Sequence, residues 1–450
     1  MIKRIFLAAA ASLLFSGVVG AQNPMSTVNY DESLVAPYSL EDPLRFVDGR
    51  KVRNPSDWEE RRAEILDIFQ HEMFGVLPPA SEIYLEELES GPTLAGFGTR
   101  RQVRMWFRED HTGPKVDWMI VTPNFVKGPA PAVLLLNYKG NQTILDDPEV
   151  IISDGWSRSS DDGTVVDGRF TEKTRGLYVG DNYRTTFPVA TILSRGYALV
   201  TACYCEVSPD PDTGMLGPGG ELLQDTFAFT GVFDLWGPRD PSRTDNTTSV
   251  MAWAWALMRG MDMIEKDPAL DESRVVLTGS SRLGKAAMLA GAYDDRFPVV
   301  VLNQTGGGGV PLAKRNFGEN VATETYMFRH WYCRAYDRYA GHTDEMSFDQ
   351  HLLVSAIAPR ALLVEGFGSP WFDTKGEFLS LQAAEPVWKK LGRGGLGSEN
   401  WPSEYDLSAV GQHLGYVRRD QDHGISVIDW KWMLDFADSN FASKVKKNRK

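Results

Sequence analysis

Residues 275–287 read VVLTGSSRLGKAA, an apolar run followed by a tight turn and then by residues that suit a helix. This order of strand, turn and helix is the setting of a nucleophile elbow, which exposes a serine at the carboxyl edge of a sheet. In that register Ser281 is the nucleophile, and Gly279 and Gly284 relieve crowding around the turn. The second glycine comes one position later than in the G-x-S-x-G motif, so a small-residue turn without catalytic function is the alternative interpretation.

Short apolar runs on both sides of this turn predict further strands. They suit a parallel sheet covered on both faces, because they are apolar throughout. Helical patterns separate them, and the clearest of these is Ser249–Lys266. Repeated strand–helix units predict the α/β class, here an α/β-hydrolase with a doubly wound, mostly parallel sheet covered by helices on both faces. The runs are 132–136 (AVLLL), 197–201 (YALVT), 299–302 (VVVL) and 361–364 (ALLV).

The first residues of the chain predict export. Lys3 and Arg4 precede an apolar run over 5–19, and small residues at 19–21 precede a cleavage point before Gln22. This is the layout of a secretory signal peptide, so we expect a protein exported to the periplasm or the medium. A membrane anchor or a buried first helix is the alternative, but the run is shorter than the ~20 residues that a membrane span needs.

The rest of the chain divides into a lead-in, a catalytic domain and a short tail. The lead-in contains a helical pattern over 58–73 and a hairpin pattern over 103–121, and we expect it to pack on the main domain as a cap. The polar, glycine-rich stretch 146–187 is expected to be a long surface insertion. The predicted boundaries are signal peptide 1–21, lead-in or cap 22–125, α/β-hydrolase domain 126–442 and basic tail 443–450.

Composition excludes several classes of function. The chain has 47 Lys+Arg against 60 Asp+Glu, a formal net charge of −13, so it has no electrostatic reason to bind nucleic acid or an anionic membrane. Its 3 cysteines are too few for a disulfide scaffold. They form no CxxC motif, and the 7 histidines form no HExxH pair. We therefore expect no catalytic metal and no cofactor, and a protein that acts as a monomer.

A serine nucleophile needs a base, and in α/β-hydrolases the base lies near the C-terminus, after the acid. His423 fits this order, because it lies in the polar stretch RDQDHG (419–424) just before a helical run. His351 precedes the penultimate strand and is out of order, so we interpret it as a buried structural histidine bonded to a carboxylate. His413 is the weaker rival to His423.

At these residues the sequence resembles a known family, the glucuronoyl esterases of carbohydrate esterase family fifteen. The most specific match is Ser281–Lys285 (SRLGK), which resembles the nucleophile motif of the family. Further blocks occur in order along most of the chain. They are RRAEIL (61–66) with FG (74–75), LNYKGN (136–141), WAWAL (253–257), KRNFGE (314–319), FDQH (348–351) and IAPR (357–360).

The resemblance implies roles for individual residues. Ser281 is the nucleophile, His423 is the general base, and the Arg282 side chain helps to hold the tetrahedral oxyanion. The sugar of a uronate is bound by Lys285, aided by Glu319 and Trp371. The reaction implied is hydrolysis of uronic-acid (4-O-methyl-glucuronoyl) esters of plant or algal polysaccharide through an acyl-enzyme.

The acid of the triad departs from the family pattern. Gln304 and Ser369 stand at the two positions where family members carry a carboxylate. We expect Glu365 to take this role, ahead of Asp373, because it ends a predicted strand at the right edge of the sheet. Alternatively Gln304 orients His423 as a neutral partner, or the enzyme is impaired. The alternative functions are a methylesterase on another polysaccharide uronate, or a weakly active or non-catalytic carbohydrate-binding protein.

Overall fold

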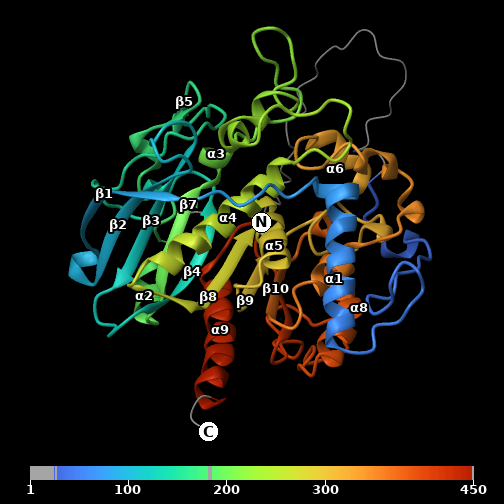
Figure 1. Ribbon diagram of the computed structural model, residues 1–450. Coiled ribbons are helices and arrows are strands. Elements are labelled where there is room, and N and C mark those ends of the chain that lie inside the picture. Colours follow the sequence, from blue (N-terminus) through green and yellow to red (C-terminus); the bar gives the residue numbers. More distant parts are fainter. Residues whose placement is uncertain (1–24, 26–27, 181–184, 448–450) are drawn as a thin grey trace, which may run out of the picture.

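The computed structural model describes residue 25 and residues 28–180 and 185–447, with no description of side chains beyond residue 442 (Figure 1). The predicted signal peptide, 1–21, lies outside the described residues. The last helix continues to Lys447, into the segment expected to be a basic tail. Among the described residues, no helix has the length and apolar character needed to cross a membrane.

A nine-stranded sheet runs through the molecule in the order β1-β2-β3-β7-β4-β8-β9-β10-β11. The strands β7, β4, β8, β9, β10 and β11 are parallel to one another. The strands β1, β2 and β3 pair antiparallel to one another, and β3 pairs antiparallel to β7. The predicted α/β-hydrolase class is therefore confirmed. The strands are β1 (Tyr84–Thr93), β2 (Gly98–Trp106), β3 (Lys115–Pro123), β4 (Ala130–Asn137), β7 (Ala198–Cys203), β8 (Leu270–Ser280), β9 (Val299–Asn303), β10 (Ala361–Phe367) and β11 (Leu414–Arg419).

Both faces of the sheet are buried. Along β4, the side chains of Leu134 and Leu136 join one apolar cluster, while Val133 and Leu135 point to the other face and join a second cluster. Helices α1, α4, α5 and α8 supply the first cluster, and α2 and α9 supply the second. The helices are α1 (Pro55–Phe69), α2 (Val189–Ser194), α3 (Tyr204–Val207), α4 (Ser249–Lys266), α5 (Arg282–Tyr293), α6 (Val321–Met327), α7 (Gln350–Ser355), α8 (Thr374–Lys390) and α9 (Val427–Lys447).

The segment 22–125, expected as a lead-in or cap, supplies part of the sheet itself. The predicted hairpin is present as β2 and β3, and β1 extends it at the edge. Because β3 pairs with β7, the hairpin continues the main sheet and does not cover it from outside. The free edge of a sheet offers unpaired backbone groups, which an antiparallel hairpin can satisfy.

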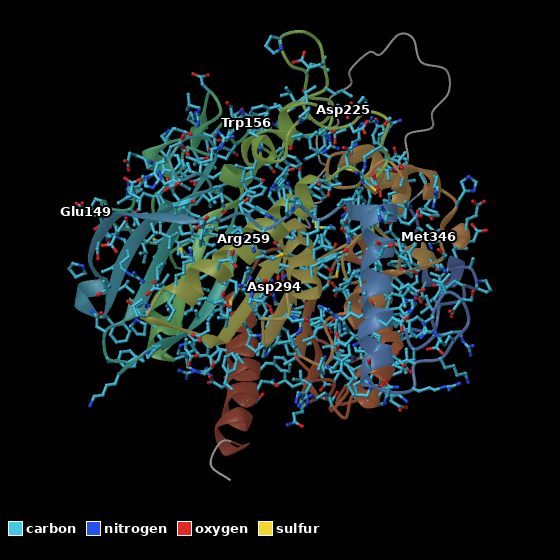
Figure 2. All side chains as sticks on the ribbon, in the orientation of Figure 1. Glu149, Trp156, Asp225, Arg259, Asp294 and Met346 are labelled. Carbon is cyan, nitrogen blue, oxygen red and sulfur yellow. The ribbon has the colours of Figure 1, made fainter. Side chains whose placement is uncertain are left out.

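The segments that follow the parallel strands gather at one end of the molecule, at the top of Figure 1, where α3 follows β7. The segment expected as an insertion contains the short antiparallel strands β5 (Val165–Val166) and β6 (Arg169–Phe170), and β5 lies at this end. Figure 2 places Trp156, from the insertion, and Asp225, from the segment between α3 and α4, at the same end. The carboxyl ends of the parallel strands are thus surrounded by loops, which is where open α/β sheets bind ligands.

Candidate active site

The turn between β8 and α5 has the geometry of a nucleophile elbow. Ser281 has φ 56° and ψ −129°, a strained conformation for a residue with a side chain. A Cβ atom on Gly279 would collide with the carbonyl oxygen of Leu283, and one on Gly284 would lie 3.0 Å from the carbonyl oxygen of Gly279. The neighbouring Ser280 is buried, and its hydroxyl donates to Asn303 Oδ1 at 3.1 Å. The strained, half-buried Ser281 is therefore the serine that the turn presents.

Arg282 begins the helix that follows the nucleophile. Its Nη1 donates to Asp210 Oδ2, and its guanidinium lies 4.7 Å from the ring centre of Trp331. Its Nε is buried and has no hydrogen-bond partner among the described residues. Burial would lower the pKa of Arg282, but the charge of Asp210 raises it above its ordinary value. The residue is a fixed cation, and because its side chain is 30% exposed, the rest of its guanidinium can face a ligand.

The loop between β11 and α9 brings His423 to the same edge of the sheet. Its Nδ1 lies 2.7 Å from Gln304 Oε1, and Gln304 directly follows β9. The Gln304 amide is oriented by both backbone groups of Gly424, since Nε2 donates to the carbonyl at 2.9 Å and Oε1 accepts from the N–H at 3.0 Å. The rings of Phe367 and Phe372 pack against the imidazole, with centroids at 5.2 Å and 4.6 Å.

The two carboxylates considered for the triad are engaged elsewhere. Glu365 Oε2 accepts from Asn303 Nδ2 at 3.0 Å, and its Oε1 has no hydrogen-bond partner among the described residues. Burial raises the pKa of Glu365 well above its ordinary value, which favours the neutral acid. Asp373 pairs with Arg315 at 2.8 Å. The structure thus places the Gln304 amide at Nδ1 of His423, where a carboxylate of Glu365 or Asp373 was expected.

The residues expected to bind sugar come together beside the elbow. Lys285, on α5, is buried, and its Nζ lies 3.8 Å from Glu319 Oε2. The backbone N–H of Glu319 donates to the carbonyl of Trp371 at 2.8 Å, which joins the two loops that carry them. Burial raises the pKa of Glu319. It also raises the pKa of Glu324 on α6, to about 8, and this second acid was not identified from the sequence.

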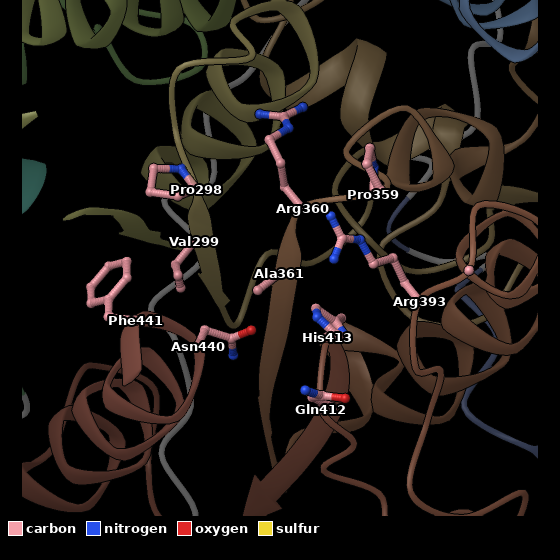
Figure 3. Close-up of a pocket in the computed structure, with 11 residues that line it drawn as sticks. Pro298, Val299, Pro359, Arg360, Ala361, Arg393, Gln412, His413, Asn440 and Phe441 are labelled. Atoms are coloured by element: carbon pink, nitrogen blue, oxygen red, sulfur yellow. The ribbon is translucent and has the colours of Figure 1, made fainter. Parts of the chain in front are cut away.

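Neither of the two histidines considered as rivals to His423 contacts Ser281. His351 is buried, and its Nε2 lies 2.7 Å from the backbone carbonyl of Glu41, which is a structural contact with a carbonyl in place of the expected carboxylate. His413 lines a cavity of about 510 Å³ at the amino ends of β9, β10 and β11, together with Arg360 and Arg393 (Figure 3). This is the edge of the sheet opposite to Ser281, so His413 cannot reach the nucleophile.

Sequence comparisons find relatives over the whole described fold. Residues 232–392 match the family model described as "Glucuronyl esterase, fungi". The "Carbohydrate esterase MZ0003" of an unknown prokaryotic organism is 32% identical over 415 residues, which cover 91% of this chain and 91% of the relative. The 4-O-methyl-glucuronoyl methylesterase of Schizophyllum commune is 25% identical over 469 residues, 96% of this chain and 98% of the relative.

Solved structures of similar proteins also superpose on most of this chain. A "promiscuous CE15 esterase from the marine bacterial metagenome" superposes with a TM-score of 0.82 at 31% identity, and the match covers 92% of this chain and 100% of the other. A glucuronoyl esterase from Solibacter usitatus superposes with a TM-score of 0.80 at 33% identity, covering 91% of this chain and 100% of the other.

Proposed function

Because this chain belongs to the glucuronoyl esterases of carbohydrate esterase family fifteen, we propose that it hydrolyses 4-O-methyl-glucuronoyl esters of plant or algal polysaccharide through an acyl-enzyme on Ser281. That it is a carboxylic ester hydrolase follows from the family. The observation that carries the mechanism is the meeting of three groups at one edge of the sheet. They are the strained Ser281, the partly exposed Arg282 guanidinium fixed by Asp210, and His423 held through Nδ1.

The reaction runs in two acyl transfers. Ser281 Oγ attacks the ester carbon of the uronate while His423 Nε2 takes the hydroxyl proton. Arg282 and backbone N–H groups of the elbow stabilise the oxyanion. The C–O bond to the alcohol then breaks, and the alcohol leaves with the proton from His423. Water then attacks the acyl carbon and gives a proton to His423. The second tetrahedral intermediate collapses as its bond to Ser281 Oγ breaks, His423 returns the proton to that oxygen, and the uronic acid leaves.

We assign to Gln304 the place of the missing acid. Its Oε1 accepts a hydrogen bond from Nδ1–H of His423, which leaves the lone pair of Nε2 for the serine proton. Two contacts to Gly424 keep the amide from flipping, so the tautomer is set without a charge. A neutral amide stabilises the imidazolium less than a carboxylate does, and replacing a triad acid can cost ~10⁴ in rate. This observation also favours the second candidate function, a weakly active carbohydrate-binding protein on the same scaffold.

Substrate recognition falls to the buried pair next to the elbow. Lys285 and Glu319 offer donors and acceptors for sugar hydroxyls, and Trp371 offers an aromatic wall. Their place beside Ser281 would bring the C6 carboxyl ester of a bound uronate to the nucleophile. An exported enzyme would meet such esters outside the cell, in keeping with the signal peptide expected over 1–21.

The test is hydrolysis of a methyl glucuronate ester by the purified mature chain. We expect turnover by the wild type and none by Ser281→Ala, with the variant folded. Ser280→Ala is the matched control, because this side chain is buried against Asn303, and it should remain active. Full turnover by Ser281→Ala, or loss confined to Ser280→Ala, would overturn the mechanism. Saturable binding of uronate oligosaccharides without any turnover by the wild type would favour the binding protein.

A further inference from the structure

We propose that Asp210 is a positioning residue for the reaction, which holds the Arg282 guanidinium in the place where it meets the oxyanion. The inference rests on the function proposed above and extends it to a residue outside the triad. Asp210 lies in the segment after α3, and its side chain is 3% exposed. It makes no contact with Ser281 or His423 among those described, so any effect on catalysis must pass through another group.

Four donors converge on the two oxygens of this carboxylate. Oδ2 accepts from Arg282 Nη1 and from the hydroxyl of Tyr204 at 2.9 Å. Oδ1 accepts from His330 Nε2 at 2.7 Å and from Trp331 Nε1 at 2.9 Å. These donors come from α3, α5 and the segment after α6, which are separate parts of the chain. The carboxylate is therefore the common anchor of three elements around the elbow.

The backbone around the carboxylate is itself restricted. Asp210 stands between Pro209 and Pro211. A proline ring fixes its own φ, and a residue that precedes proline is confined to extended conformations. The backbone of Asp210 is therefore restricted before any contact forms, and the four hydrogen bonds then fix its side chain.

This arrangement divides the donors of Arg282 between the protein and the substrate. Nη1 donates to Asp210, while 30% of the side-chain surface stays exposed on the substrate side of the proposed site. The ring of Trp331, 4.7 Å from the guanidinium, supports its flat face. A planar fork held on one side and along its face can turn little, so its remaining donors keep one direction. An oxyanion donor contributes to rate only when it is fixed in that way.

The ionisation of Asp210 suits this role. Burial would raise its pKa, but the charge of Arg282 and the hydrogen bond from His330 hold the pKa well below its ordinary range. The carboxylate is thus charged throughout the pH range in which the esterase would work. Its negative charge reduces the attraction of Arg282 for an oxyanion, but an unpaired buried guanidinium would turn toward water, so the fixed position outweighs the lost charge.

The experiment is a double-mutant cycle between Asp210→Asn and Arg282→Gln, measured as kcat and KM on a methyl glucuronate ester. The asparagine matches aspartate in shape, but its NH2 group opposes a donor on either side. We expect each single variant to lose kcat by about 10²-fold, as for one oxyanion donor, with little change in KM. We expect the double variant to equal Arg282→Gln alone, because Asp210 has no effect once the guanidinium is gone.

A structural role would give the opposite pattern. If Asp210→Asn lowers kcat of the Arg282→Gln enzyme by the same factor as in the wild type, or leaves wild-type kcat unchanged, the inference is overturned. Tyr204→Phe is the matched control, because it removes another donor to the same oxygen and should keep kcat within about 3-fold.

Two further comparisons keep the test decisive. If Asp210→Asn alone does not fold, Arg282→Gln and the double variant still can. In Arg282→Gln the Asp210 carboxylate keeps three hydrogen-bond donors, and the double variant contains neither charge. A lower kcat in the double variant than in Arg282→Gln overturns the inference. Loss of turnover in Ser281→Ala together with unchanged kcat in Asp210→Asn would remove this inference alone, whereas full turnover by Ser281→Ala would remove the proposed mechanism.

Discussion

Two residues of the proposed machinery share an unusual backbone. Ser281 has φ 56° and Gln304 has φ 51°, and they directly follow the neighbouring strands β8 and β9. Left-handed backbone costs a residue with a side chain roughly 1–3 kcal/mol, so it persists only where the surroundings hold it. Here the Ser281 N–H donates to the carbonyl of Asn303 at 3.0 Å, and the Gln304 N–H donates to that of Glu365 at 2.8 Å. Both side chains are therefore aimed by the sheet edge itself.

A prediction at this scale concerns the amide of Gln304. We expect Gln304→Glu to raise kcat by roughly 10-fold, because a carboxylate at Nδ1 stabilises the imidazolium. The gain stays well below ~10⁴ because one carboxylate oxygen would face the carbonyl of Gly424 without a donor. A carboxylate beside the imidazole favours its protonated form, and His423 must lose a proton to act as the base. The acidic limb of the kcat/KM profile should therefore also move to higher pH. The charged groups on this loop are Asp420, Asp422 and Arg419, which bonds the Gly424 carbonyl and pairs with Asp429.

The control for this prediction is Glu365→Gln. Glu365 is buried on Asn303 and favours its neutral form, so the amide should leave kcat within about 3-fold. Steady-state kinetics from pH 5 to 9 would check both variants. A loss of several orders of magnitude in Glu365→Gln, or a loss in Gln304→Glu with an unmoved pH profile, would contradict the neutral partner.

At the scale of elements, the active-site loops are tied to one another by buried charges. Arg419, at the end of β11, pairs with Asp429 on α9 at 2.9 Å and donates to the carbonyls of Asp422 and Gly424. The residues on either side of His423 are thus held by the junction of a strand and a helix. The base is located by these two elements as much as by its contact with Gln304.

Glu206, on α3, links the sheet edge to the insertion and yields a pH prediction. Its carboxylate accepts from the N–H of Asp117 at 2.7 Å and from the hydroxyl of Ser153 at 2.6 Å. Burial raises its pKa from 4.5 to about 7. The folded state therefore holds the proton more tightly than the unfolded state, so this group lowers stability as pH rises from 4.5 through 7.

We expect Glu206→Gln to be neutral near pH 5 and stabilising at pH 8. At pH 5 the native side chain is already uncharged, whereas at pH 8 the variant avoids a buried charge and gains on the order of 1–3 kcal/mol. Thermal unfolding of both proteins at the two pH values checks this. An equal difference in Tm at pH 5 and pH 8 would show that the ion contact with Lys115, at 3.9 Å, already offsets the burial.

At the scale of the whole molecule, the N-terminal segment 28–42 contacts the loop that carries Glu319, a residue that we propose to bind sugar. The carbonyl of Asn29 accepts from the N–H of Gly318 at 2.8 Å. Glu32 pairs with Arg315 at 2.7 Å, and Glu41 pairs with Lys314 at 2.6 Å. Lys314, Arg315 and Gly318 lie just before Glu319 in the chain. This segment is therefore a support for the loop that carries Glu319, which we propose to bind the substrate.

Removing residues 22–40 should raise KM more than it lowers kcat. The loop that carries Glu319 would lose its contacts with Asn29 and Glu32, while Ser281, Arg282 and His423 keep theirs. We expect KM to rise by roughly 5–10-fold, which corresponds to about 1 kcal/mol of binding free energy. Kinetics on a methyl glucuronate ester measure the split. The milder Glu32→Gln removes two partly exposed ion pairs, with Arg315 and with Lys375, and should change KM by less than about 3-fold. A fall in kcat at constant KM would contradict this role.

The sequence alone determined the fold class, the elbow and the family. The apolar runs, the glycines at 279 and 284 and the block SRLGK are local patterns. Each reflects the packing and steric needs of residues only a few positions apart, so it can be recognised in the sequence. The order of the blocks along the chain placed Ser281, Arg282 and His423 without coordinates. The strands β1 and β11 were not predicted, and the lead-in was not expected to extend the sheet, since edge pairing leaves little signal in one strand's own residues.

The partners of the catalytic residues were decided only by the tertiary structure. The contact of His423 with Gln304 joins residues 119 apart in the chain, and that of Arg282 with Asp210 joins residues 72 apart. Both contacts depend on how neighbouring strands and the loops after them pack. That packing decides which side chain lies within hydrogen-bond distance of the catalytic residue. Glu365 lies within β10, opposite Asn303 of β9, and sequence position could not tell that its carboxylate turns toward Asn303. A shift of one residue at the end of a strand reverses the face to which a side chain points, and so decides between an acid and an amide.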